Sequence, residues 1–589
     1  MAKKILQGIP VSVGVAIGHA YILTRDHFCL APIQNISEEL VEQEIKRLED
    51  AFELTISNLK ELKAKIPEEQ TEYSSIIDTQ IMMLQDPKLK HAITKYIKDM
   101  KLNAEWAVEK GIGDIEKTFN GIEDEFFKTR ISEFKLLSRK VIGNLIGAGE
   151  ELKPIKSRVI LVAHELTPAD TVELDVSKIM AFVTAQGGKT SHVSIVARTL
   201  GIPAIVGIED VENQILDDEF IIVDGFTGRI LIEPEEEEIY EYTERQISFE
   251  QYKRELFQQS GLPGKTKDGF HVKVMANIEL FEEVSSALDY AAEGIGLYRT
   301  EYSYLYRSRL PGEDELYEEY RDLVSIMSPK PVVIRTLDAG GDKIGKGFEK
   351  LEEANPAMGL RAIRFCLKFK KIFKTQLKAI LRAAEAGNAL LMFPMISGLE
   401  ELRDAKRVLE EAKNELEKEG KSYKRDIPVG IMIELPSAVL VAEDLAKEVD
   451  FFSIGTNDLI QYSLGIDRTN KYVSHLFQPL HPAIIKSIKH TVDVAKRAGI
   501  YVSMCGEMAG DPFCIPLLIG MGVDILSTTP HSVPGVKRVI RMLSKKECED
   551  LLNKVLQNSS VKENNRIVKE KVFDKIPEEL TFYTSFFDN

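Results

Sequence analysis

A histidine that follows two glycines is the residue in this chain best placed for chemistry. Residues 187–198 read GGKTSHVSIVAR, and they place His192 in the first turn of a predicted helix that runs to about Leu200. The glycines let the backbone approach an anion, and the free N–H groups of the first turn point at it. The positive helix end disfavours an imidazolium, so we expect His192 to be a neutral nucleophile that carries phosphate. The alternative is a buried histidine that caps its own helix.

Charged, amide and thiol side chains recur where short apolar runs end in the C-terminal half of the chain. The residues at or just after these ends are Arg299, Arg335, Glu434, Asn457, Asp458 and Cys505. On one face they would form a site for an anionic, metal-bound ligand, because planar guanidinium groups pair with phosphate and carboxylate. Glu434 and Asp458 offer the hard oxygen ligands that Mg²⁺ takes, and Cys505 can donate a proton.

Arg361 and Arg468 are two further arginines that can pair with an anion. Structural ion pairs are the alternative for both of them. Cys505 has an alternative too, since a single cysteine is often a small residue of the core. The interpretation as one site therefore depends on a fold that brings these residues together.

Eight short apolar runs alternate with longer helical stretches beyond residue 270. They cover residues 271–278, 294–300, 332–338, 389–396, 429–435, 450–456, 501–507 and 524–529. Eight such runs predict a (β/α)8 barrel, whose active site lies at the C-terminal ends of its strands. The candidate residues fall at those ends. A doubly wound open sheet is the alternative fold.

The N-terminal part of the chain has a different pattern. Short β segments are predicted within residues 8–24 and again from 158 to 232, and the helix of His192 lies in the second of these regions. Between them, residues 35–38 (NISE) resemble a capping box that opens a long helix, whose apolar stripe runs from Val41 to Ile66. Further helices are predicted over residues 70–85, 88–100, 103–119 and 124–147. An α-helical bundle is thus inserted into a small α/β domain.

A chain of 589 residues is too long for a single core. We expect a multidomain α/β protein in which residues 1–30 and 150–232 form the α/β domain and residues 31–149 form the helical subdomain. The charged segment 233–260 predicts an exposed linker helix, and residues 261–589 form the barrel. The run Gly264-Lys265-Thr266 is not a phosphate-binding loop, because position 259 holds no glycine.

Composition excludes several function classes. The net charge of −17 with interleaved signs argues against nucleic acid or an anionic membrane as the main partner. Five scattered cysteines indicate neither a disulfide framework nor a zinc cluster and fit a reducing cytoplasm, and we expect Cys366 and Cys514 in the core. There is no apolar signal segment and no stretch long enough to span a bilayer. A cytoplasmic protein without membrane insertion is expected.

Residues 187–198, followed by Gly-Ile-Pro-Ala at 201–204, resemble the phosphohistidine site of the phosphoenolpyruvate-utilising enzymes. Further motifs resemble the phosphoenolpyruvate-binding barrel of that family, at residues 296–301 (GLYRTE), 335–343 (RTLDAGGDK), 355–361, 432–434, 452–461, 467–468 and 504–507. The resemblance implies that His192 takes phosphate from phosphoenolpyruvate through Nε2. It also implies substrate binding by Arg299, Arg335, Arg361, Asn457, Asp458 and Arg468, a Mg²⁺ ion on Glu434 and Asp458, and protonation of the pyruvate enolate by Cys505.

The helical insertion before His192 resembles the Enzyme I branch of this family. The dikinase and synthase branches carry an ATP-binding domain ahead of the phosphohistidine domain instead. The resemblance to the Enzyme I branch implies that the helical subdomain docks the phosphocarrier protein HPr, which receives the phosphate in the first step of sugar phosphotransferase transport. It also implies a homodimer formed through the barrel. Two alternatives remain: a dikinase-type protein with a separately encoded ATP module, and a metabolite-sensing binding protein with a residual barrel.

Overall fold

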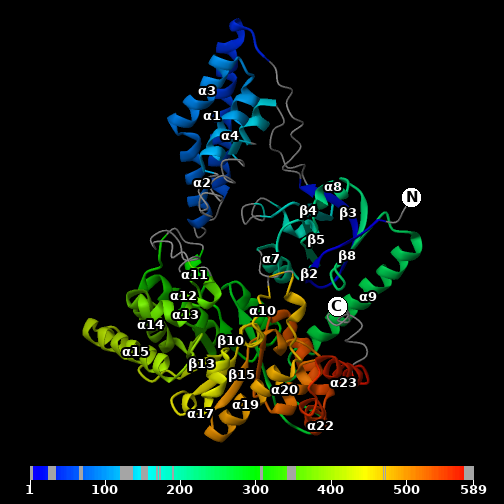
Figure 1. Ribbon diagram of the computed structural model, residues 1–589, viewed down its shortest axis with the longest axis vertical. Coiled ribbons are helices and arrows are strands. Elements are labelled where there is room, and N and C mark those ends of the chain that lie inside the picture. Colours follow the sequence, from blue (N-terminus) through cyan, green and yellow to red (C-terminus); the bar gives the residue numbers. More distant parts are fainter. Residues whose placement is uncertain are drawn as a thin grey trace. The chain divides into compact units, whose positions relative to one another are not determined.

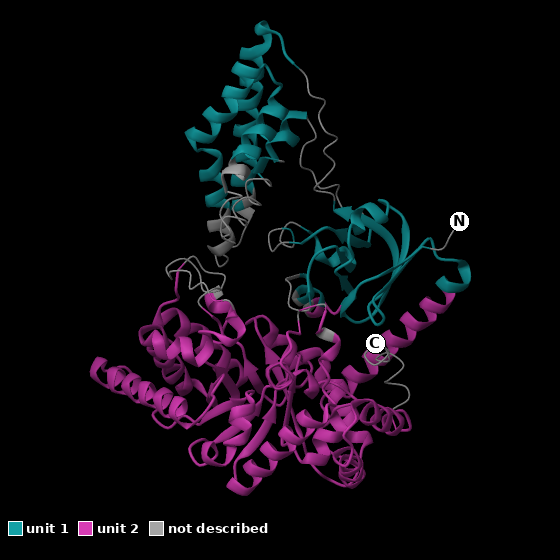
Figure 2. Ribbon diagram, viewed as in Figure 1, with its two compact units in different colours: residues 1–197, 202–239 teal, residues 198–201, 240–589 magenta. Residues whose placement is uncertain are grey.

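The structure, a computed structural model, describes the chain over the following residues: 4–23, 35–65, 71–119, 137–138, 140–146, 155, 157–166, 170, 174–188, 192–305, 309–340, 353, 355–468, 470 and 472–575. The chain divides into two compact units (Figure 2). The first comprises residues 1–197 and 202–239, and the second residues 198–201 and 240–589. The division falls inside one long helix, α9 (Glu236–Gln258), within the segment for which a linker helix was predicted.

An eight-stranded mixed sheet forms one part of the first unit, with the order β1-β8-β7-β3-β4-β5-β6-β2. Its strands are β1 (Lys4–Gln7), β2 (Ile9–Ser12), β3 (Val15–Leu23), β4 (Val159–Ala163), β5 (Ile179–Thr184), β6 (Ala204–Val206), β7 (Phe220–Asp224) and β8 (Arg229–Ile232). All five residues of β4 are buried, as expected for a central strand with both faces covered. The predicted β segments are confirmed, and β1 adds a strand that the sequence pattern did not single out.

Helix α7 (His192–Leu200) follows β5 and begins at the histidine itself. Gly201 ends the helix with a φ of 66°, a left-handed conformation that glycine adopts without strain. The short helix α8 (Val211–Gln214) follows β6. The sequence therefore predicted both ends of the helix that carries His192.

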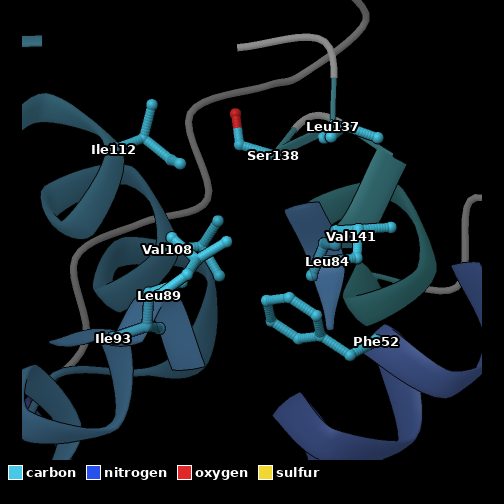
Figure 3. A pocket seen from close by; sticks show the side chains of 9 residues that line it. All are labelled: Phe52, Leu84, Leu89, Ile93, Val108, Ile112, Leu137, Ser138 and Val141. Atoms are coloured by element: carbon cyan, nitrogen blue, oxygen red, sulfur yellow. The ribbon is translucent and has the colours of Figure 1, made fainter. Parts of the chain in front are cut away.

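A helical bundle is the other part of the first unit. It contains α1 (Val41–Lys65), α2 (Thr71–Leu84), α3 (Pro87–Met100) and α4 (Ala104–Phe119), with a further helical segment at 140–146. Residues 137–138 are helical as well, and the rest of the predicted helix 124–147 lies outside the described residues, as does Ile66 at the end of the predicted stripe. The bundle interior is apolar, and Figure 3 shows nine residues around a small space within it: Phe52, Leu84, Leu89, Ile93, Val108, Ile112, Leu137, Ser138 and Val141. Phe52 belongs to the predicted stripe, which thus packs the core.

The capping box predicted at residues 35–38 does not form. Ser37 makes no side-chain cap, and a 3₁₀ turn at Glu38–Leu40 precedes α1. In this turn the N–H of Leu40 donates to the backbone oxygen of Ser37 at 3.0 Å. The chain enters α1 through the tighter turn, whose backbone hydrogen bond takes the place of the side-chain cap.

The second unit is built on a closed barrel of eight parallel strands (Figure 1). The strands are β9 (Lys273–Ile278), β10 (Ile295–Tyr298), β11 (Val332–Arg335), β12 (Ala389–Phe393), β13 (Val429–Ile433), β14 (Phe451–Ile454), β15 (Tyr501–Met504) and β16 (Ile525–Thr528). Strand β16 pairs with β9 and closes the barrel. Each of the eight predicted runs contains one strand, so the (β/α)8 barrel is confirmed and the doubly wound open sheet is wrong.

Helices lie around the outside of this barrel in Figure 1. They are α10 (Glu283–Asp289), α11 (Tyr302–Leu305), α12 (Glu313–Met327), α13 (Ala362–Lys368), α14 (Lys370–Ala383), α15 (Leu399–Glu419), α16 (Pro436–Leu440), α17 (Ala442–Leu445), α18 (Thr456–Leu464), α19 (Pro482–Ala498), α20 (Ile515–Met521), α21 (Val533–Met542), α22 (Lys545–Leu556) and α23 (Val561–Phe573). A separate buried cluster fills the barrel interior, with Leu297, Val333, Leu390, Met392, Met432, Phe451 and Cys505 as members. The interior is therefore a packed core, as is usual for this fold.

The C-terminal part of α9 packs on the barrel unit. The guanidinium group of Arg538, on α21, lies over the ring of Tyr252 at 5.3 Å from its centroid. Arg538 also pairs with Glu255 at 3.4 Å. These contacts explain why the compact unit of the barrel includes most of the predicted linker helix.

Other expectations concern loops, cysteines and membranes. The hydroxyl of Thr266 donates to Asp268 and accepts the backbone N–H of Phe270, so the run at 264–266 leads into the turn at 267–268. Cys366 and Cys514 are buried as expected. Over the part of the chain that the structure describes, no helix combines the length and hydropathy that a bilayer crossing needs.

Candidate active site

The barrel brings the predicted residues of its strand ends to one end of the sheet. Arg335 is the last residue of β11, while Arg299, Glu434 and Cys505 directly follow β10, β13 and β15. Asn457 and Asp458 occupy the first turn of α18, which follows β14. Because the strands are parallel, all of these positions lie at the C-terminal mouth of the barrel. The sequence therefore predicted where this set of residues meets.

Arg335 is the most enclosed cation of this group. Its guanidinium pairs with Glu301 at 3.1 Å and with Asp338 at 3.0 Å, and its side chain is 10% exposed. Burial acts to lower the pKa of Arg335, but the charges of Glu301, Asp338 and Glu434 outweigh burial and raise it. The buried Nε atom of Arg335 has no hydrogen-bond partner among the described residues. A buried donor without a partner fits a ligand that supplies the acceptor.

Arg361 joins the same network from the start of α13. It donates to Asp338 at 2.8 Å and lies 3.6 Å from Asp458. Burial opposes the charge of Asp338, yet Arg335 and Arg361 hold the pKa of this carboxyl below its ordinary value. Arg361 thus forms ion pairs, as the alternative interpretation expected. Its partners Asp338 and Asp458 belong to the candidate site, so the pairs do not separate Arg361 from that site.

Three carboxylates meet beside the two arginines. Ligand oxygens of Asp338, Glu434 and Asp458 all lie within 4.8 Å of one another. Glu434 is almost completely buried, and it accepts the N–H of Met395 at 2.6 Å. Burial, followed by repulsion from Asp458 and Asp338, raises the pKa of Glu434 well above its ordinary value. A divalent cation would relieve this repulsion, so the donor set fits Mg²⁺ and contains one ligand more than the predicted pair.

Space beside Glu434 is kept free by a glycine. A Cβ atom at Gly455 would lie 2.9 Å from the Oε2 atom of Glu434 and equally close to the sulfur of Met432. Real Cβ atoms do not approach that closely, and the neighbours are packed side chains. Gly455 therefore permits the approach of β14 to the carboxylates.

Cys505 directly follows β15 and is buried. Its thiol accepts a hydrogen bond from the hydroxyl of Ser453 at 3.3 Å, and its backbone oxygen accepts one from Asn277 at 2.9 Å. Burial raises the pKa of Cys505. A thiol that keeps its proton at neutral pH is suited to act as an acid.

The remaining predicted residues lie around the same mouth. Arg299 is partly exposed and pairs with Glu279. Asn457 and Glu507 exchange two hydrogen bonds, at 3.2 and 3.1 Å, and Arg468 lies 3.7 Å from Glu507. Glu507 thus holds an amide and a guanidinium group near each other.

Gln376 supports the site from the helix α14 behind it. Its side-chain oxygen accepts the N–H of Leu337 at 3.0 Å, and its amide donates to Thr300 at 3.0 Å. The hydroxyl of Thr300 in turn donates to the backbone oxygen of Arg335 at 2.9 Å. One buried amide therefore connects the loops that follow β10 and β11.

Several of these residues were not singled out from the sequence. Asp338, Glu301 and Glu507 each lie within three residues of a predicted site residue, and each stands inside a quoted motif. Their position in those motifs was the available signal. Ser453 also stands inside a quoted motif, at 452–461, although it was not singled out there. Gln376 had no such signal, because nothing in a helix pattern shows which buried polar residue faces a site.

The segment around His192 is described only in part. The backbone oxygen of Gly188 accepts the hydroxyl of Ser194 at 2.7 Å, which connects the second glycine of the motif to α7. Residues 189–191 and the side chain of His192 lie outside the described parts of the chain. The neutral state and nucleophilic role of His192 stay predictions.

Comparison with known proteins gives matches along nearly the whole chain. Family models described as PEP-utilising enzyme match in three segments, the N-terminal model at residues 7–130, the mobile domain at 155–228 and the PEP-binding domain at 253–545. A solved structure described as a solution structure of Enzyme I is 31% identical, with a TM-score of 0.35, and covers 42% of this chain and 99% of that chain.

Two curated relatives show the family. The phosphoenolpyruvate-protein phosphotransferase of Bacillus subtilis is 39% identical over 568 residues, which is 96% of this chain and 99% of that protein. The protein of the same name from Listeria monocytogenes is 38% identical over 572 residues, or 97% and 99% of the two chains. With this identity over almost the full length, and with three matching family models, the chain belongs to the phosphoenolpyruvate-protein phosphotransferases, a family of phosphoenolpyruvate-utilising enzymes.

Proposed function

We propose that the chain transfers the phosphoryl group of phosphoenolpyruvate to its own His192 and then to a histidine of the phosphocarrier protein HPr. Pyruvate is released, and the reaction is the first step of sugar phosphotransferase transport. The observation that carries the barrel's part in this proposal is the network of Arg335 and Arg361 with three carboxylates at the barrel mouth. It combines cations for an anionic substrate with oxygen ligands for a metal ion.

The arginines bind the substrate. Phosphoenolpyruvate carries a phosphate and a carboxylate, and the guanidinium fork matches both groups in shape and charge. Arg335 contributes its partnerless Nε, and Arg299, Arg361 and Arg468 add three further guanidinium groups. Asn457 adds an amide donor. Asp458 and Glu507 keep Arg361 and Arg468 oriented.

The metal ion is Mg²⁺ in this proposal, and Asp338, Glu434 and Asp458 would hold it. When bound, it supplies positive charge that offsets the carboxylates and the charge of the transferring phosphoryl group. The raised pKa of Glu434 supports the assignment, because three carboxylates this close are unfavourable without a cation.

The chemical steps assign one task to each reacting residue. His192 attacks phosphorus, the P–O bond to the enol oxygen breaks, and the arginines stabilise the enolate that takes the electron pair. The enolate methylene carbon then takes the proton of Cys505, so that an S–H bond breaks and a C–H bond forms. This step yields pyruvate and a thiolate, which water protonates again.

The two units divide the work. His192 belongs to the first unit and the arginines to the second, so the units must meet during phosphoryl transfer. The helical subdomain at 31–149 is the proposed docking site for HPr. A homodimer formed through the barrel and a cytoplasmic location complete the proposal, supported by the family resemblance and the absence of a membrane-spanning helix among the described residues.

Pyruvate release tests the reaction. The full-length chain with phosphoenolpyruvate and Mg²⁺ should release one pyruvate per chain, and continuous release should require added HPr. Labelling from ATP without phosphoenolpyruvate would instead identify a dikinase-type protein. Binding of phosphoenolpyruvate without pyruvate release would identify a metabolite-sensing protein.

A further inference from the structure

A buried serine on the strand next to Cys505 donates its hydroxyl to the thiol. Ser453 lies on β14 and is fully buried. Its Oγ atom lies 3.3 Å from the Sγ atom of Cys505. The thiol directs its own proton to the backbone oxygen of Ile454, 3.7 Å from the sulfur, so Ser453 is the donor to the sulfur.

The backbone of Cys505 is fixed independently of this serine. Its N–H donates to the backbone oxygen of Ile454 at 3.2 Å. Its own backbone oxygen accepts the amide of Asn277 at 2.9 Å, and the hydroxyl of Ser527 holds that amide in place by a hydrogen bond of 2.6 Å. The residue would therefore keep its place without Ser453, and what the serine adds is a donor at the sulfur.

The chemistry at the sulfur needs such a donor. Once the thiol gives its proton away, a thiolate is left in a buried site, where burial disfavours charge. The positive charges of Arg335 and Arg299 favour a thiolate at Cys505, and the negative charge of Glu434 disfavours it. A hydroxyl aimed at the sulfur stabilises the thiolate directly, because hydrogen bonds to charged groups are stronger than those to neutral groups.

We propose that Ser453 is a positioning residue that holds the sulfur of Cys505 and stabilises the thiolate formed when Cys505 protonates the pyruvate enolate. The inference rests on the acid role assigned to Cys505 above. In the forward step the S–H proton goes to the methylene carbon, and the thiolate accepts the Ser453 O–H until water restores the thiol. In the reverse direction the thiolate takes a methyl proton from pyruvate, and the same hydrogen bond holds it ready.

Strand β15 provides a control. Ser503 stands opposite Ser453 in the β14–β15 pairing and is also buried. Its hydroxyl donates to the backbone oxygen of Phe452 at 3.3 Å. The two serines thus share residue type, sheet position and burial, but only Ser453 donates to the thiol.

The test compares Ser453→Ala with Ser503→Ala in the full-length chain with Mg²⁺. We expect Ser453→Ala to lower kcat for pyruvate formation, and the exchange of pyruvate methyl protons with D₂O, about tenfold, as for the loss of a hydrogen bond to a charged group. KM for phosphoenolpyruvate should not change, since the hydroxyl of Ser453 donates to the thiol and not to the substrate. Ser503→Ala should behave as the unmodified chain. Equal losses in both variants would overturn the proposal.

A second pair of variants guards against a folding defect. Ser453→Thr and Ser453→Val have nearly the same shape and differ in the hydroxyl, so Thr should exchange methyl protons about tenfold faster than Val. Equal rates would overturn the role of the hydroxyl. Cys505→Ala distinguishes a failure of the acid role of Cys505 from a failure of the role of Ser453. If it leaves methyl exchange intact, the acid role of Cys505 fails. If it abolishes exchange while Ser453→Ala and Ser453→Val have no effect, only the role of Ser453 fails.

Discussion

Arg335 is the last residue of β11, and it forms a buried ion pair with Asp338, three residues later, at an N–O distance of 3.0 Å. Asp338 also accepts a hydrogen bond from Arg361 and belongs to the carboxylate group with Glu434 and Asp458. The Asp338 side chain therefore pairs with two arginines proposed to bind the substrate, and it is also one of the three carboxylates proposed to bind the metal ion. Because these functions share Asp338, the arginines and the metal site should respond together when either is changed.

Replacing Arg335 by lysine keeps the positive charge but removes the planar fork. We expect Arg335→Lys to raise KM for phosphoenolpyruvate about tenfold or more, because a lysine cannot make two parallel hydrogen bonds to one anion. Steady-state kinetics at saturating Mg²⁺ would measure this. Arg321→Lys is the control, since Arg321 pairs with Asp322 on the outer helix α12. An unchanged KM in Arg335→Lys would remove Arg335 from substrate binding.

The carboxylate group can be tested through its metal requirement. We expect Glu434→Gln to raise the Mg²⁺ concentration for half-maximal activity about tenfold or more, because a neutral amide is a poorer ligand for a hard cation. Chelation of divalent cations should abolish activity of the unmodified chain, and added Mg²⁺ should restore it. The control is Glu443→Gln, whose side chain is exposed and pairs with Arg497. A Mg²⁺ titration of Glu434→Gln that overlays the unmodified chain would contradict the assignment.

Gln376 provides a test of how the site is positioned. We expect Gln376→Met to lower kcat/KM for phosphoenolpyruvate about tenfold, because the loops after β10 and β11 lose their shared partner. Leaving the N–H of Leu337 unpaired should also cost about 2 kcal/mol of stability. Phosphoryl exchange between His192 and HPr should be unaffected, since it does not use the barrel. Thr491→Val is the control, because its buried hydroxyl bonds within its own helix. An equal effect of both substitutions on kcat/KM would show a general loss of stability instead.

An ion-pair cluster outside the site makes the stability of the fold depend on pH. Glu313 on α12 pairs with Lys378, Arg382 and Lys421 at 2.9, 2.6 and 2.8 Å. Burial alone would raise its pKa, but hydrogen bonds from these cations outweigh burial and lower the pKa of Glu313 to about 2. A folded-state pKa below the unfolded value means that the carboxylate stabilises the fold above the unfolded pKa. This contribution is lost as the pH falls through the folded pKa.

We therefore expect Glu313→Gln to melt a few degrees below the unmodified chain at pH 7. The difference in Tm should persist down to about pH 5 and shrink below it, because the unfolded carboxyl begins to take up protons near its ordinary pKa. Thermal unfolding at several pH values would measure this. Glu250→Gln is the control, as Glu250 pairs with Lys253 on the same helix. A difference in Tm that grows as the pH falls would contradict the sign.

Much of the barrel and its site could be predicted from the sequence. The strands of a parallel barrel are short apolar runs whose ends can be read from the sequence, and these ends all lie at one mouth. Arg335 and Glu434 could be placed at strand ends and thus at one mouth. The predicted capping box at residues 35–38 was wrong, since a local motif does not decide between a side-chain cap and a 3₁₀ turn. Contacts across the barrel, such as Ser453 with Cys505, depend on register and rotamer, which a pattern of residues does not contain.

The site of phosphorylation tests the central claim most directly. The full-length chain, incubated with labelled phosphoenolpyruvate and Mg²⁺, should carry one acid-labile phosphate, mapped to His192, and release an equal amount of pyruvate. His192→Ala should take up no phosphate and still bind phosphoenolpyruvate, because the substrate is held by Arg299, Arg335 and Arg468. Phosphate mapped to another residue, or labelling that persists in His192→Ala, would contradict the assignment of His192 as the acceptor.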